Sequence, residues 1–157
     1  MFLMSSVNWL IYLSIYFSGT SIDKAKFEKI RSEIILSYHT HQAEQAIGYK
    51  SGTLTISEQG FLRYTLKTTN GKTEYYSLKL EKLKDISFLG TENANWLLLR
   101  CDDDSVIYQT YQDKSGEVDE MINYIKIPLK NLNIDGVNQL NTNFNLLKQL
   151  FCVNTNL

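Results

Sequence analysis

The chain of 157 residues has the length of a single domain, and its 16 Lys and Arg against 17 Asp and Glu give a formal charge of −1. This balance argues against a nucleic-acid partner or a charge-driven membrane contact, since both need a large positive field. With 43% hydrophobic and 21% charged residues the composition is that of a folded globular protein. Two cysteines are too few for a disulfide scaffold or a four-thiolate zinc site.

The first 22 residues contain no charged side chain, and residues 9–17 form a compact apolar run. Small residues follow at 18–21, as a signal peptidase requires, although the usual basic n-region is missing. The run is shorter than the roughly 20 apolar residues that span a bilayer. We therefore expect residues 1–21 to be a cleaved signal peptide, with a retained membrane anchor or an ordinary buried segment as alternatives. Residues 22–157 would then form one secreted or periplasmic domain, which meets a membrane only if the segment is retained.

Two amphipathic helices are predicted at the ends of this domain. The first follows Asp23 as its N-cap and fades at residues 39–42, and the second follows Asp135 as its N-cap. Each has an apolar stripe at intervals of three or four residues, made by Phe27, Ile30, Ile34 and Tyr38 in the first and by Val137, Leu140, Phe144, Leu147 and Phe151 in the second. Because such a helix gains little alone in water, we expect the second to lie on a sheet.

Between residues 50 and 136 the apolar period changes from 3.6 to 2, which predicts strands. About seven are expected, at 53–56, 62–67, 76–81, 86–88, 96–99, 106–111 and 121–129. The first residues of the last segment also fit a helical stripe, made by Val118, Met121, Ile122 and Ile125. Asn70-Gly71 is the signature of a type I′ hairpin turn, and Pro128 belongs at a sheet edge or a strand end. Strands at hairpin spacing predict an α+β fold in which an antiparallel meander is capped by the C-terminal helix.

In the order of its elements, seven strands and then a helix, the stretch 50–151 resembles a pleckstrin-homology-like barrel. The resemblance rests on element order alone, and a strongly curved open sheet between two helices is the alternative. It implies little about activity, because that superfold includes lipid-binding, peptide-binding and purely structural domains.

The residues that could carry chemistry form no complete motif. His39 and His41 fit a solvated helix end, and residues 102–104, all Asp, fit a charged turn better than a calcium loop. Cys101 and Cys152 fit two separate buried thiols, with a disulfide as the alternative. The sequence has no nucleophile elbow, P-loop or dinucleotide glycine pattern. We therefore expect no enzymatic activity, no metal and no cofactor.

Aromatic side chains are the best candidates for a binding surface. Phe61, Tyr75, Trp96 and Tyr111 are the predicted ligand-binding residues, because large amphipathic rings on one sheet face can form a binding patch. The alternative is that the two helices cover these rings or that the rings pair across strands.

The leading hypothesis is an exported, non-catalytic binding or interaction module whose protein or small-molecule partner is unknown. The first alternative is an immunity or inhibitor protein for a secreted toxin. The second is a small-molecule carrier with an apolar cavity inside its sheet.

Overall fold

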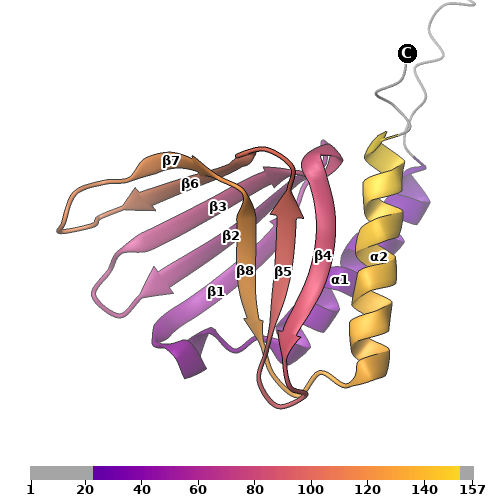
Figure 1. Cartoon of the computed structure of the whole chain (residues 1–157), viewed down its shortest axis with the longest axis horizontal. Coiled ribbons are helices and arrows are strands. Elements are labelled where there is room, and N and C mark those ends of the chain that lie inside the picture. The colour runs from indigo at the N-terminus through magenta and orange to yellow at the C-terminus, as the bar shows by residue number, and fades with distance from the viewer. Residues whose placement is uncertain (1–22, 153–157) are drawn as a thin grey trace, which may run out of the picture.

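A computed structural model describes residues 23–152, so the predicted leader at 1–21 lies outside the described residues. The described part is α+β, with a helix at each end and eight antiparallel strands between them (Figure 1). In chain order the elements are α1 (Lys24–His41), η1 (Glu44–Ile47), β1 (Tyr49–Ile56), β2 (Phe61–Thr68), β3 (Thr73–Lys79), η2 (Leu80–Lys82), β4 (Leu83–Gly90), β5 (Asn95–Cys101), β6 (Val106–Tyr111), β7 (Asp119–Ile122), β8 (Tyr124–Leu129) and α2 (Ile134–Cys152).

The strands form two sheets, and the described strands do not close into a barrel. A five-stranded sheet has the order β1-β2-β3-β6-β7, and a three-stranded sheet has the order β4-β5-β8. Figure 1 shows the three-stranded sheet crossing in front of the five-stranded one, with α2 beside β4 and α1 behind. The predicted single meander is therefore wrong after β3. The β4–β5 hairpin leaves the first sheet, and β6 returns to pair with β3.

The predicted last strand, 121–129, is two strands that belong to different sheets. Asn123 lies between them, and its carbonyl accepts a hydrogen bond from the Cys101 amide at 2.9 Å. Ile122 packs against the core and Ile125 is buried. A continuous strand cannot turn two residues three positions apart to the same face, so the chain has to turn at Asn123.

The two predicted helices and their apolar stripes are confirmed. Asp23 caps α1 by accepting a hydrogen bond from the Lys26 amide at 3.1 Å. The predicted cap of α2 is wrong by two residues, because Asn133 Oδ1 accepts from the Gly136 amide at 2.9 Å and Asp135 lies in the first turn. The two helices meet where the rings of Phe27 and Phe151 pack edge to face at 5.9 Å.

The hairpin at Asn70-Gly71 joins β2 to β3 as predicted, but its turn is not type I′. Only Gly71 has a positive φ, of 96°, whereas type I′ requires a positive φ at both central residues. The Asn70 side chain is used instead as an acceptor, for the amide of Lys72 at 3.3 Å.

One apolar cluster fills the space between the sheets and the helices. Both sheets and both helices contribute fully buried side chains to it, among them Leu62, Leu99, Ile34 and Phe144. Pro128 lies in β8, an edge strand, next to its last residue. Within residues 23–152 no helix combines the length and the apolarity that crossing a membrane requires.

Candidate functional site

The outer face of the five-stranded sheet, which points away from the core cluster, carries three of the four predicted aromatic residues. Tyr75 is half-buried, whereas Phe61 and Tyr111 are 49% and 57% exposed. Tyr75 and Tyr111 line one surface hollow, and Phe61 lines another near the opposite end of the strands. The helices do not cover these rings, so the three residues share a face without forming one cluster.

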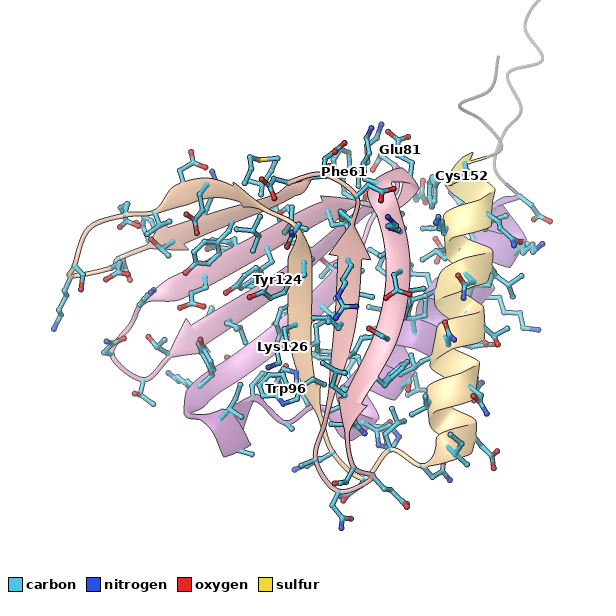
Figure 2. The ribbon with its side chains drawn as sticks, in the orientation of Figure 1. Phe61, Glu81, Trp96, Tyr124, Lys126 and Cys152 are labelled. Atoms are coloured by element: carbon cyan, nitrogen blue, oxygen red, sulfur yellow. The ribbon has the colours of Figure 1, made fainter. Side chains whose placement is uncertain are left out.

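Trp96 lies elsewhere, on the outer face of the three-stranded sheet. The Lys126 ammonium lies 4.1 Å from the centroid of its ring, a cation–π contact. Figure 2 shows both residues on β5 and β8, with Tyr124 farther along β8 and Phe61 well apart. The structure therefore does not join Trp96 to the other three aromatic residues.

A groove of about 520 Å³ runs between α1 and β1. Its walls are Arg31, Ser32, Ile35, Leu36 and His39 from the helix and residues 53–56 from the strand. Leu36 is 68% exposed there and adds apolar surface to the helix wall of the groove. Arg31 lies at one end, where its Nη1 reaches the Ile56 carbonyl at 3.5 Å. The groove has the volume typical of a ligand site and is mainly apolar.

The strand wall of this groove is the free edge of a sheet. In the β1–β2 hairpin the Ser57 amide donates to the Phe61 carbonyl, and all residue pairs from 56↔62 to 51↔67 keep that register. Hydrogen-bonded pairs alternate in antiparallel strands, so Thr53 and Thr55 bond to β2. The amide and carbonyl of Leu54 therefore point toward the groove, and no described side chain bonds to either group.

The other three sheet edges are covered, short or charged, as soluble proteins require. The end of β8 is covered, because its Pro128 carbonyl accepts from the Ala43 amide at 3.2 Å. β4 lies beside α2, and β7 has only four residues, of which Asp119 and Glu120 are charged. β1 has eight residues, and Lys50 is its single charged side chain. Among the described edges β1 is the long, weakly charged one.

Two carboxylates, those of Glu44 and Glu74, lie buried among tyrosines against the inner face of the five-stranded sheet. Glu44 Oε1 accepts from the hydroxyls of Tyr38 and Tyr64 at 2.5 and 2.9 Å. Burial is the main cause that raises the pKa of both phenols, and the adjacent Glu44 adds to it. Both phenols therefore stay neutral and act as donors.

Glu74 is held in a similar way in a second cluster, by Tyr49, Tyr76 and Lys72. Its Oε2 accepts from Tyr49 at 3.2 Å and Tyr76 at 3.1 Å, and its Oε1 lies 3.1 Å from the Lys72 ammonium. Lys72 also pairs with Asp113 at 2.8 Å, and this hydrogen bond is the main cause that raises the pKa of Lys72. Because every charged oxygen of Glu74 has a partner here, this cluster is satisfied within the chain.

The remaining sequence candidates are separate from one another. His41 Nδ1 contacts the Lys130 carbonyl at 3.0 Å, and His39 lines the groove. Asp102 pairs with Lys84 at the surface. Cys101 has a free, buried thiol, whose pKa burial raises to about 11. No group of three His, Cys, Asp or Glu side chains that could hold a metal occurs in the part of the chain that is described.

Sequence reasoning missed both the groove and the two buried carboxylates. Glu74 has the same strand parity as Tyr76 and Leu78, so the two-residue period already turned it inward. Glu44 lies in a connection, where no period exists to place it. The groove depends on which strand lies at the sheet edge, and that is a property of topology.

Comparison with protein-family models, with curated proteins and with solved structures gives no match for this chain.

Proposed function

We propose that this chain is a non-catalytic binding module that takes up an extended polypeptide segment as an added strand on β1, in the groove between α1 and β1. The supporting observation is the Leu54 backbone, whose amide and carbonyl face the groove with no described partner. In strand addition such main-chain groups give affinity, and side-chain pockets give specificity.

The groove adds the apolar contacts that main-chain hydrogen bonds alone do not supply. Leu36 and Ile35 present aliphatic surface opposite the strand, and Thr53 and Thr55 extend that surface onto the outer sheet face. A bound segment would bury these groups and satisfy the open edge together.

Export of the module remains part of the proposal and rests on the leader pattern at residues 1–21. A carrier function has less support, because side chains of both sheets and both helices fill the space in which a ligand would lie.

The exposed residue Leu36 gives a direct test by peptide selection. A library of displayed random 12-residue peptides is selected on the wild-type chain, and the recovered peptides are measured on Leu36→Glu and on Ile134→Glu. Ile134 is 70% exposed on α2, so it matches Leu36 in size and exposure away from the groove. A charge in the groove should weaken binding at least tenfold, since it must lose hydration when the segment docks. Binding by Ile134→Glu should be unchanged.

Hydrogen exchange at the edge gives an independent readout. In the free protein the Leu54 amide should exchange faster than the Thr53 and Thr55 amides, and a selected peptide should protect it. Peptides that bind Leu36→Glu as well as wild type, or that leave the Leu54 amide unprotected, would refute strand addition on β1.

A further inference from the structure

A second pocket, smaller and polar, lies next to η1. Its volume is about 210 Å³, and its walls are Gln42, Ala43, Glu44, Gln45, Ala46, Ser51 and Lys130. Glu44 is only 2% exposed, yet it forms part of the pocket wall. The pocket therefore gives access to a carboxylate that is otherwise enclosed by protein.

The charge of Glu44 is only partly compensated by its neighbours. Both tyrosine hydroxyls bond to Oε1. In the described part of the chain, no hydrogen bond reaches Oε2 and no cation lies within 4.0 Å of the carboxylate. Neutral phenols donate hydrogen bonds but do not neutralise a charge, and a buried charge without a counter-ion is costly.

The backbone around Glu44 leaves the room that this arrangement needs. Gly52 faces the core in β1, and a Cβ atom there would collide with the Glu44 side chain. Glu44 thus fills the position that an alternating strand would give to its own side chain. This packing fixes the position of the Glu44 side chain beside the pocket.

Gln42, Gln45 and Ser51 add acceptors to the pocket, whereas Lys130 is its cationic wall residue. Gln42 and Gln45 donate their side-chain NH₂ groups to the carbonyls of His39 at 3.2 Å and Lys50 at 3.5 Å. Their side-chain carbonyl oxygens therefore remain available, as does the Ser51 hydroxyl. An ammonium group has three donors and no acceptor, so it matches this set. A Ca²⁺ or Mg²⁺ ion would need about six oxygen ligands, usually with more than one carboxylate among them.

We propose that this pocket binds a primary ammonium group, either on a lysine side chain of a polypeptide or on a free alkylamine, with Glu44 Oε2 as its anionic partner. The proposal goes beyond strand addition on β1 and does not depend on it, because a free amine is enough to test it.

The test titrates butylammonium into the ¹⁵N-labelled full chain and follows the amide resonances of residues 44–46 and 51. Saturable shifts are expected with butylammonium. Tetramethylammonium has the charge without N–H donors, and 1-butanol has the chain without the charge, so neither should bind. Equal shifts from either of these compounds, or none from butylammonium, would overturn the proposal.

Variants assign the binding to Glu44. Glu44→Gln should weaken binding at least tenfold, because it removes a charge-assisted hydrogen bond. Glu92→Gln, at an exposed carboxylate, is the matched control and should bind as wild type. If Glu44→Gln does not fold, Gln45→Leu replaces an exposed wall residue and should weaken binding several-fold. Wild-type affinity in the folded Glu44 or Gln45 variant would contradict the proposal.

Lys130 carries the chain's own ammonium group on the same wall, so it serves as an internal check. Lys130→Ala should tighten butylammonium binding by about two- to fivefold, since a nearby like charge is removed. Binding that appears only in Lys130→Ala would mean that Lys130 occupies the pocket, which overturns the proposal. Nα-acetyl-lysine methylamide distinguishes the sources: tighter binding than butylammonium assigns a polypeptide lysine, and equal or weaker binding assigns a free amine.

Discussion

At the scale of single residues, the interior of the five-stranded sheet combines large rings with polar ends. Tyr64, Tyr76 and Tyr108 are register neighbours on three adjacent strands, and the rings of Tyr76 and Tyr108 stack at 4.8 Å. Each ring adds apolar area to the core, while its hydroxyl must find a partner there. Glu44 accepts from Tyr64 and Glu74 accepts from Tyr76, so these two rings and the two carboxylates depend on each other.

This dependence predicts how stability falls in alkali. The pKa of Tyr64 is raised far above its ordinary value of 10, chiefly by burial, so above about pH 10 the folded state retains a proton that the unfolded state releases. That contribution is fully present below pH 10 and is lost as pH rises, at about 1.4 kcal/mol per pH unit. Tyr64→Phe should therefore show a shallower alkaline loss than wild type by that amount, measured by urea unfolding between pH 8 and pH 11.

Tyr75, on the outer face of the five-stranded sheet, provides the control for this measurement. Tyr75→Phe also removes one hydroxyl, but from a residue that is outside the buried cluster. If the free energies of unfolding of wild type and Tyr64→Phe fall in parallel above pH 10, the Tyr64 proton is not linked to folding.

Residue-level prediction from sequence succeeds where a period exists and fails elsewhere. The two-residue alternation places Tyr64 and Tyr76 inward, and it places Tyr75 outward, as the structure has them. The same parity puts Gly52 on the core side of β1, which leaves a gap that some other group must fill. Sequence alone cannot say that Glu44 fills it, because that contact joins a loop to a strand.

At the scale of elements, the helices follow from sequence because their stripes are local. Phe27, Ile30, Ile34 and Tyr38 are the buried residues of α1, as the 3.6-residue period predicts. Helix ends are harder to predict, since several polar residues near a boundary can serve as caps. Asn133 and Asp135 are both good capping residues, and only the backbone geometry decides between them.

The cap of α2 can be tested by two neighbouring substitutions. Asn133→Ala removes the acceptor of the Gly136 amide and should lower the free energy of unfolding by about 1 kcal/mol. Asp135→Ala removes a charge from the first turn and should have the smaller effect, of about 0.3–1 kcal/mol in low salt. Urea unfolding at low and high salt separates the two, because only the second effect is screened. A larger loss of stability in Asp135→Ala than in Asn133→Ala would show that Asp135 is the N-cap.

At the scale of the whole molecule, the pairing of strands goes beyond what the sequence pattern contains. Alternation tells which face of a strand is buried, but β3 could pair with β4 or with β6 on that criterion alone. One local signal existed: the inward parity changes between Ile122 and Ile125, which marks the turn at Asn123 between the sheets. The groove and the open edge of β1 follow from this topology, so they cannot be predicted from the sequence pattern either.

The two sheets share one core, and this predicts that they unfold together. Leu147 is fully buried on α2 within the cluster to which both sheets contribute. Leu147→Ala should lower the free energy of unfolding by about 2–5 kcal/mol, the usual cost of a core cavity. Within each protein, wild type or variant, the amide resonances of Tyr64 in β2 and of Leu99 in β5 should be lost at one shared urea concentration. The reason is that a small domain with one core unfolds in a single transition. Separate midpoints for the two sheets would show that the cluster is two cores, and that α2 stabilises only one of them.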